Sequence, residues 1–320
     1  MFLSICLNPT IQKTLRFPSL ELGEVNRTAA HHLDASGKGV NVIRVLTQLK
    51  KEAAQSIPAA TQSIPNTTQS IPNATHLTHL GGVMRPLFLS LCEQDGLAIE
   101  WAESDSEIRF CYTVINESDS SVTELVEESQ PIAAGTEERL LDKFNEIILR
   151  HDTYKTIIIS GTKAAGYSDA VIPTMVQKAK EKGLRIILDI KGKDLIESLK
   201  YEPDVIKPNL EEFKQTFEIN SDLHGFVLEL ARKHKCRIIL TNGSQEIIAA
   251  DSNEIFKFEI PPTKALNTTG CGDAFTAGLA AALSNAEINK ESFNAAIYEG
   301  IRCGALNAAF IKPGVIFSDK

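Results

Sequence analysis

From about Lys155 onward, the chain alternates short β-rich runs with amphipathic segments, and this pattern restricts the folds that it can adopt. The β-rich runs cover residues 156–160, 185–189 and 237–241, and an amphipathic segment covers residues 169–182. Strands that alternate with helices of about 10 to 15 residues predict βαβ units, and therefore a parallel sheet with helices on both faces. Ligands of such sheets bind at the carboxyl ends of the strands. We expect an α/β core with its site at that edge.

The N-terminal part of the chain follows another pattern. Residues 1–7 are apolar and predict a first strand that stops at Asn8-Pro9. The segments 12–17, 26–33, 108–115 and 121–126 have the composition of polar-edged strands, with few helical segments between them. These four strands are expected to form a small sheet separate from the core.

Composition argues against several classes of function. The chain has 320 residues, of which 43% are hydrophobic and 23% charged, enough for one large α/β domain or two small ones. Its 33 Lys and Arg against 41 Asp and Glu give a net charge of −8, and no basic cluster is interleaved with aromatics, which argues against a nucleic-acid partner. No apolar stretch approaches the roughly 20 residues of a membrane span, which argues against a membrane partner.

The six cysteines form no Cys-x-x-Cys pair, so we expect reduced thiols in a cytoplasmic protein rather than a zinc site or a disulfide framework.

A low-complexity segment lies at about residues 52–75. The sequence Gln-Ser-Ile-Pro occurs there three times, starting at positions 55, 62 and 69, with Asn, Thr and Ala between the copies. The prolines forbid a continuous helix, and the polar filler cannot build a core. We predict a surface insertion without a catalytic role.

The motif Gly270-Cys271-Gly272-Asp273 has the residues of an anion-binding loop with a base beside it. The two glycines let the backbone turn tightly and approach a ligand, and the run that follows, to Leu283, favours a helix. The free N–H groups of the first turn and the positive end of the helix dipole suit a phosphoryl group. Asp273 stands where a substrate hydroxyl would meet that group, and the helix N-terminus is expected to lower the pKa of its carboxyl. The structural alternative is a plain Asp N-cap after a glycine-rich loop.

A second glycine-rich loop, Ser36-Gly37-Lys38-Gly39, precedes another helix, whose apolar positions from Val42 to Leu49 share one face. Lys38 and Asn41 would project from the helix entry, a cation suited to phosphate and a two-way hydrogen-bonding group suited to sugar hydroxyls. The alternative is a capped surface helix, since the Walker A pattern Gly-x-x-x-x-Gly-Lys-Ser/Thr does not occur in the chain.

The segment Lys207-Pro208-Asn209 joins the end of a strand to the start of a helix, and Glu212 follows Asn209 at the spacing of a capping box. The functional alternative is that Asn209 and Glu212 hold Mg²⁺ through its waters. Mg²⁺ prefers oxygen ligands and keeps much of its hydration.

Together these segments resemble the ribokinase-like sugar kinases of the PfkB family, and within it the branch that phosphorylates sugar phosphates. The similarity runs nearly end to end, and its parts stand in family order: residues 7–11, residues 36–41, Gly81-Gly82, the strand around Arg109, Ser160-Gly161, residues 207–212 and residues 270–273. The resemblance implies a single kinase domain over residues 1–320, with a three-layer α/β/α core and a mostly parallel central sheet. A small β lid, at about residues 11–36 and 105–128, would close over the sugar and pair with the lid of a second subunit in a homodimer.

The resemblance also implies roles for individual residues, carried over by position. Asp273 would be the catalytic base, with Gly270 and the N–H groups of Cys271, Gly272 and Asp273 as the anion hole. The sugar phosphate would contact Gln12, Gly37, Lys38, Asn41 and Arg109, of which Lys38 and Arg109 would hold the phosphate already on the substrate. ATP would contact Lys207, Asn209, Thr241, Gly243 and Asn307, and Asn209 with Glu212 would serve Mg²⁺ through water.

Two departures from the family pattern bear on the substrate. The family usually has Asp where this chain has Gln12, and the Leu-Pro-x-Gly that usually follows Ser-Gly is replaced by residues 162–166, which place the charge of Lys163 near the site. The predicted function is ATP- and Mg²⁺-dependent phosphorylation of fructose 1-phosphate to fructose 1,6-bisphosphate, with tagatose 6-phosphate and fructose 6-phosphate as alternative substrates. A function of another class, a degenerate kinase that senses a sugar phosphate without turnover, is motivated by those departures. The retained Asp273, Asn209 and Glu212 favour catalysis.

Overall fold

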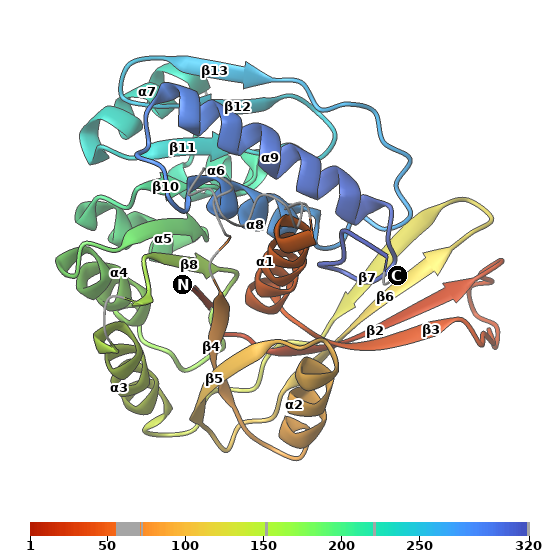
Figure 1. The fold of residues 1–320 in the computed structure, drawn as a ribbon. Coiled ribbons are helices and arrows are strands. Elements are labelled where there is room, and N and C mark those ends of the chain that lie inside the picture. The colour runs from red at the N-terminus through yellow and green to blue at the C-terminus, as the bar shows by residue number, and fades with distance from the viewer. Residues whose placement is uncertain (56–70, 72, 151–152, 220–221, 319–320) are drawn as a thin grey trace.

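Within the residues that the structure describes, the strands form one sheet of nine strands and a separate sheet of four (Figure 1). The computed structural model describes residues 1–55, 71, 73–150, 153–219 and 222–318. Most of the predicted surface insertion at residues 52–75 lies outside these ranges, and it stays a prediction.

The larger sheet forms the core, and its strand order is β13-β12-β11-β10-β9-β8-β1-β4-β5. The strands are β1 (Phe2–Ile5), β4 (Ala74–Leu80), β5 (Ala98–Glu103), β8 (Thr156–Ser160), β9 (Arg185–Asp189), β10 (Val205–Ile206), β11 (Arg237–Leu240), β12 (Ile247–Ala250) and β13 (Ile255–Phe258). β12 pairs antiparallel with β11 and β13, and the other pairs are parallel. The predicted α/β core with a mostly parallel sheet is therefore confirmed.

Helices cover both faces of this sheet, as the alternating pattern predicts. Side chains of a strand alternate between faces, so Ile157 and Ile159 pack on one layer and Ile158 on the other. The first layer holds α3 (Thr136–Leu149), α4 (Val171–Glu181), α5 (Gly192–Ser198), a 3-10 turn (Leu199–Tyr201), α6 (Leu210–Phe217) and α7 (Leu223–His234). The second layer holds α1 (Lys38–Gln55), α8 (Cys271–Leu283) and α9 (Lys290–Ala308). In the part of the chain that is described, no helix has both the length and the apolar character that crossing a membrane requires.

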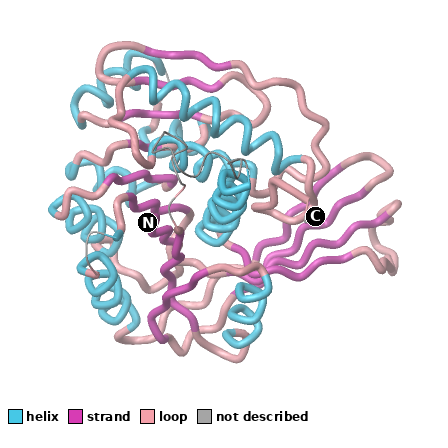
Figure 2. Tube along the Cα trace, in the orientation of Figure 1, coloured by secondary structure: helices cyan, strands magenta, loops and turns pink. Residues whose placement is uncertain are grey.

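The smaller sheet, called the lid sheet below, projects from one side of the core (Figure 2). Its order is β3-β2-β6-β7, from β2 (Thr10–Phe17), β3 (His31–Ser36), β6 (Arg109–Asn116) and β7 (Ser121–Val126). Phe88 of α2 (Arg85–Gln94) shares an apolar cluster with Ile11 at the base of this sheet. β3 begins later than the predicted segment 26–33, because the Asn26 side chain bonds to the backbone of Glu21 and holds this part of the chain in a loop.

The order of the larger sheet creates a switch point beside β1. β1 pairs in parallel with β4 on one side and with β8 on the other. From β1 the chain continues to β4 on one side, and from β8 it continues to β9 on the other side. Ligands of open α/β sheets bind at the carboxyl ends of two such neighbouring strands. β2 starts at Thr10, shortly after β1 ends, so the lid sheet begins at the same edge.

Candidate active site

The first turn of α8 presents backbone N–H groups at this edge. Gly270 precedes the helix with a φ of 84°, and a Cβ there would lie 2.9 Å from Pro313 Cβ, so both backbone conformation and space require glycine. The Cys271 N–H donates to the Thr268 carbonyl at 3.2 Å, and the Ala274 N–H donates to the Gly270 carbonyl at 2.8 Å. Between them, the N–H groups of Gly272 and Asp273 have no acceptor among the described residues. These two groups are open to an anion, whereas the Cys271 N–H is already bonded.

Asp273 is a buried carboxyl group with one bonded oxygen. The residue is 6% exposed, and its Oδ2 accepts a hydrogen bond from Asn41 Nδ2 at 2.8 Å. Burial raises the pKa of Asp273 to about 6, although the ammonium groups of Lys38 and Lys207 and the bond from Asn41 oppose the rise. The expectation of a lowered pKa is therefore wrong, because the sequence shows the helix end but not the depth of burial. The raised value still lies below neutrality, so at neutral pH the carboxyl is mostly ionised and able to accept a proton.

Asp189 stands in none of the motifs above, and it forms ion pairs with two lysines of the predicted site. Its Oδ1 lies 3.4 Å from Lys38 Nζ and its Oδ2 lies 3.2 Å from Lys207 Nζ. Burial alone would raise the pKa of Asp189, but the ammonium groups of Lys207 and Lys38 hold it below its ordinary value. The available signal was its position, since it is an acidic residue that closes a buried strand at the carboxyl end.

Lys207 lies close to the N-terminus of α8. Its side chain is buried, and a Cβ built at Gly272 would lie 3.9 Å from Lys207 Nζ. The ammonium group therefore stands beside the open N–H groups of Gly272 and Asp273. A fixed cation and preorganised N–H donors together suit negative charge that develops on a phosphoryl group.

The lid sheet brings Arg109 into the same region. Its Nε donates to Thr10 Oγ1 at 3.1 Å, and its Nη1 donates to the Glu127 carbonyl at 3.2 Å. Arg109 and Lys38 line the same cleft, one from β6 and the other from the start of α1. The cleft therefore has two cationic side chains in addition to Lys207.

Two other side chains of the lid sheet face this cleft. Gln12 Nε2 donates to Thr113 Oγ1 at 2.7 Å, which leaves the amide oxygen of Gln12 as its acceptor for a ligand hydroxyl. Glu124 of β7 accepts a hydrogen bond from Thr269 Oγ1 at 2.7 Å, a direct contact between the lid sheet and the loop before α8.

Two cavities meet at that loop. The polar cavity is the cleft that Arg109 and Lys38 line. It has a volume of about 500 Å³ and lies between the lid sheet and the carboxyl edge of the core. The apolar cavity has a volume of about 360 Å³, and its lining includes Phe275 and Ile301. Thr241, Thr268 and Gly272 line both, so a ligand with an apolar ring at one end and charged groups at the other would extend from one cavity into the other.

The structure brings most of the predicted site residues together in the polar cavity, which is lined by Gln12, Gly37, Lys38, Asn41, Arg109, Lys207, Asn209, Glu212, Thr241, Gly270, Gly272 and Asp273. Cys271 and Gly243 line the apolar cavity. Asn307 lines neither cavity: its Nδ2 donates to the Thr269 carbonyl at 3.0 Å and its Oδ1 accepts from the Gly314 N–H at 2.7 Å. Lys163, expected to add charge near the site, instead pairs with Asp169 and Asp194.

Asn209 and Glu212 form a capping box at the start of α6 and also face the polar cavity. Asn209 Oδ1 accepts from the Glu212 N–H at 2.8 Å, and Glu212 Oε2 accepts from the Asn209 N–H at 3.1 Å. No group of three or more His, Cys, Asp or Glu that could hold a metal ion occurs among the described residues. The oxygen-only donors and this sparse set fit a hydrated Mg²⁺ bound mainly by water and phosphate, and do not fit an ion held directly by a protein cage.

The comparisons with known proteins concern nearly the whole chain. The model of the family described as pfkB family carbohydrate kinase matches residues 1–310. Tagatose-6-phosphate kinase of Staphylococcus epidermidis is 26% identical over 327 aligned positions, which cover 100% of this chain and 96% of that protein.

Solved structures share the fold at lower identity. Phosphofructokinase-2 of Escherichia coli, in complex with substrates and products, has a TM-score of 0.79 and 19% identity, covering 96% of this chain and 93% of that one. A possible 1-phosphofructokinase of Thermotoga maritima has a TM-score of 0.79 and 16% identity, covering 97% and 92%. At such identities the structures show a common fold, and they do not distinguish one sugar phosphate from another.

Proposed function

The chain belongs to the pfkB family of carbohydrate kinases, which are phosphotransferases with an alcohol group as acceptor, and from this premise we propose that it transfers a phosphoryl group from ATP to a phosphorylated ketohexose. Fructose 1-phosphate, converted to fructose 1,6-bisphosphate, is the first candidate. The observation that carries the proposal is the cleft with Asp273 at its base and two cations, Lys38 and Arg109, in its lining. The phosphate already on the substrate would pair with these two cations, whereas an unphosphorylated sugar carries no anion to do so.

The residues of the cleft divide the chemistry between them. Asp273 orients the acceptor hydroxyl and takes its proton, since its carboxyl is mostly ionised at neutral pH. The N–H groups of Gly272 and Asp273, with the Lys207 ammonium beside them, stabilise the charge on the transferred group. Positioning and charge stabilisation supply most of the catalysis of phosphoryl transfer, and this cleft provides both.

The donor nucleotide is proposed to lie across the two cavities. The apolar cavity, with Gly243 and Phe275 in its lining, suits the adenine ring, and the junction at Thr241 and Gly272 suits the phosphates. Asn209 and Glu212 would hold Mg²⁺ through water, and the ion would neutralise phosphate charge. Asn307 supports the loop at Thr269 from behind, so its contribution to nucleotide binding would be indirect.

Tagatose 6-phosphate and fructose 6-phosphate are the alternatives to fructose 1-phosphate. The relative from Staphylococcus epidermidis acts, by its name, on tagatose 6-phosphate. Gln12 presents a neutral amide to the substrate hydroxyls, and a neutral acceptor discriminates less sharply between hydroxyl arrangements than a carboxylate does. The cleft therefore supports a sugar phosphate as the substrate class, with its identity open to a direct assay.

The test is ADP release with Mg²⁺ and ATP across fructose 1-phosphate, fructose 6-phosphate, tagatose 6-phosphate, fructose and ribose. We expect kcat/KM on at least one sugar phosphate to exceed that on fructose by about 100-fold or more, because two charged side chains would contact its phosphate. Turnover confined to fructose or ribose would reject the phosphate-binding role of Lys38 and Arg109. Silence on the whole panel with ATP binding intact would favour a sugar-phosphate sensor.

A further inference from the structure

The Asn41 side chain contacts Asp273 with one end of its amide and Arg44 with the other. Its Nδ2 donates to Asp273 Oδ2 at 2.8 Å, and its Oδ1 accepts from Arg44 Nη1 at 2.9 Å. The two ends of an amide have opposite hydrogen-bonding character. In the reversed orientation the amide oxygen would face the Asp273 carboxylate, and the donated bond would be lost. The orientation of Asn41 therefore decides whether the charged form of Asp273 is stabilised.

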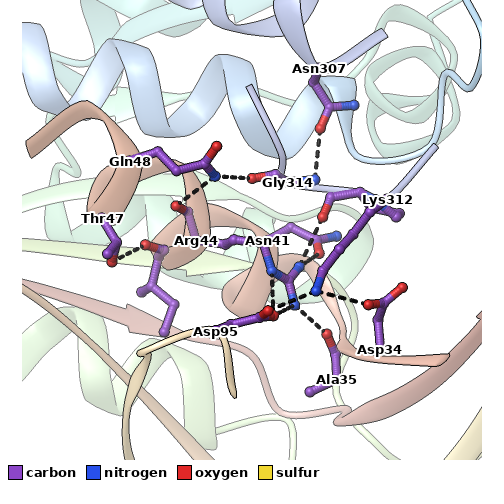
Figure 3. A network of polar contacts seen from close by, with 12 residues as sticks. Asp34, Ala35, Asn41, Arg44, Thr47, Gln48, Asp95, Asn307, Lys312 and Gly314 are labelled. Atoms are coloured by element: carbon purple, nitrogen blue, oxygen red, sulfur yellow. Dashed lines mark hydrogen bonds and ion pairs between the residues drawn. The ribbon is translucent and has the colours of Figure 1, made fainter. Parts of the chain in front are cut away.

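The Arg44 guanidinium is buried and bonded in several directions (Figure 3). Its Nε donates to Asp95 Oδ2 at 2.9 Å, its Nη1 donates to the Pro313 carbonyl at 2.9 Å, and its Nη2 donates to the Ala35 carbonyl at 2.7 Å. A guanidinium carries donors and no acceptor. It therefore accommodates the oxygen end of the Asn41 amide and excludes the nitrogen end.

The surroundings of Arg44 limit its movement. Asp95, at the C-terminal end of α2, also binds Lys312 Nζ at 2.7 Å. Gly314 packs closely on α1, where a Cβ would lie 3.0 Å from the Cα and carbonyl oxygen of Asn41. A buried charge that loses a partner is strongly unfavourable, so the guanidinium keeps this position. Arg44 does not line the polar cavity, so it does not contact a ligand there itself, and the hydrogen bonds that link it to Asp273 run through Asn41.

We propose that Arg44 is a positioning residue of this active site: it selects the orientation of the Asn41 amide in which the nitrogen end donates to Asp273. The catalytic meaning of this contact rests on the proposed function, in which Asp273 is the base. Other charged groups also face Asp273, namely Lys38 at the start of α1, Asp189 at the end of β9 and Lys207 after β10. The test must therefore separate an effect of Arg44 through Asn41 from an effect of its charge.

The direct measurement is an NMR titration of the Asp273 carboxyl in protein labelled with ¹³C at the aspartate carboxyls, with Asp273→Asn to identify the resonance. Arg44→Met should raise the pKa of Asp273 by about one pH unit, the shift expected when a carboxylate loses a hydrogen bond. Arg44→Lys keeps the charge but not the planar donor fork, and it should give a similar rise. In an Asn41→Ala background, Arg44→Met should add nothing further, because the side chain that transmits the effect is gone.

Lys312→Met is the matched control. Lys312 pairs with Asp34 and Asp95, so the substitution removes one positive charge from the same network without touching Asn41. It should lower thermal stability and leave the pKa of Asp273 unchanged. An unchanged pKa in both Arg44 variants would overturn the proposal. A rise that persists in the Asn41→Ala background would also overturn it, since that rise would come from charge alone.

The titration does not require turnover, so failure of this proposal and failure of the proposed function are distinguishable. If the wild-type protein releases no ADP with any sugar of the panel, the function fails and the titration still tests Arg44. If it is active, the acid limb of kcat should move upward in Arg44→Met by the same amount as the pKa, with the KM for ATP changed by less than about twofold. If Arg44→Met does not fold, Arg44→Lys gives the same readout.

Discussion

The Asp273 carboxyl is the group expected to take the proton of the substrate hydroxyl. Asp273→Asn preserves size and can still accept the bond from Asn41, but it cannot take up a proton. We expect turnover to fall by about 1000-fold or more. ATP affinity, measured by calorimetry, should change little, because the substitution leaves in place both the apolar cavity and the backbone N–H groups of Gly272 and Asp273.

Asp169→Asn is the control for that substitution, since Asp169 lies on the surface in ion pairs with Lys163 and Lys193. It should leave ADP release unchanged. An Asp273→Asn enzyme that keeps more than about a tenth of the wild-type rate would show that another group accepts the proton.

The buried position of Asp273 also sets an acid limit to catalysis. Burial raises its pKa to about 6, and a base must be ionised to accept a proton. Below that pH, kcat/KM should therefore fall by about tenfold per pH unit, and above it the profile should level off. The measurement is kcat/KM between about pH 5 and pH 8 at constant ionic strength. A profile that stays level down to about pH 5, as the ordinary aspartate value of 3.8 would give, would contradict this account.

Single residues show how far the site can be predicted from sequence. Lys38, Asn41 and Asp273 stand in motifs at helix starts, and the structure brings all three into one cavity. Asp189 stands in no motif, and it meets Lys38 across 151 positions of sequence. Such a pairing depends on which strands lie side by side, and local patterns do not encode that order. The burial that raises the pKa of Asp273 has the same origin.

At the scale of elements, β6 carries Arg109 into the polar cavity, which Lys38 lines from the start of α1. If these cations hold the substrate phosphate, Arg109→Ala should raise the KM for the preferred sugar phosphate by about 10- to 100-fold, with smaller changes in kcat and in the KM for ATP. Initial rates with each substrate varied give these constants. Arg16→Ala is the matched control, because Arg16 lies in an exposed ion pair with Glu117 on the same sheet. An unchanged KM for the sugar phosphate in Arg109→Ala would remove Arg109 from the phosphate site.

The boundaries of some elements follow directly from the sequence. Residues 156–160, 185–189 and 121–126 are strands with the predicted bounds, since short β-rich runs between polar turns mark strands. β3 differs, with His31–Ser36 in place of 26–33. Asp34 to Ser36 owe their strand conformation to pairing with Thr10 to Gln12, and pairing with a distant segment outweighs local propensity.

At the scale of the whole molecule, the position of the lid sheet over the cleft follows from pairing between distant segments. β2 and β6 pair in parallel, which sets Arg109 opposite Thr10 at the start of both strands. The contact of Glu124 with Thr269 then joins the far strand of this sheet to the loop before α8. Each strand is visible in the sequence, but the enclosure of a polar cavity between the two sheets is a property of their arrangement.

The same arrangement leaves one edge of the lid sheet uncovered by the described chain. β7 is an edge strand, and all six of its residues are exposed. Leu125 is 54% exposed and Val126 is 53% exposed. Exposed apolar edge strands pair readily with other strands, and proteins usually cover or charge them. We expect the lid sheet to be the surface through which two copies of this chain associate.

Light scattering after size exclusion should therefore give twice the 35.0 kDa of one chain. Leu125→Glu should separate the two copies, because it places a carboxylate where an apolar contact is expected. Leu149→Glu is the matched control, since Leu149 is 62% exposed at the end of α3, on the opposite side of the core from the lid sheet (Figure 1), and this variant should stay dimeric. A wild-type protein with the mass of a single chain in the presence of sugar phosphate would contradict the prediction. If Leu125→Glu separates the copies and raises the KM for the sugar phosphate, pairing of the lid sheets helps each cleft to close over its substrate. If the copies separate and the KM does not change, each lid sheet closes over its own substrate without its neighbour.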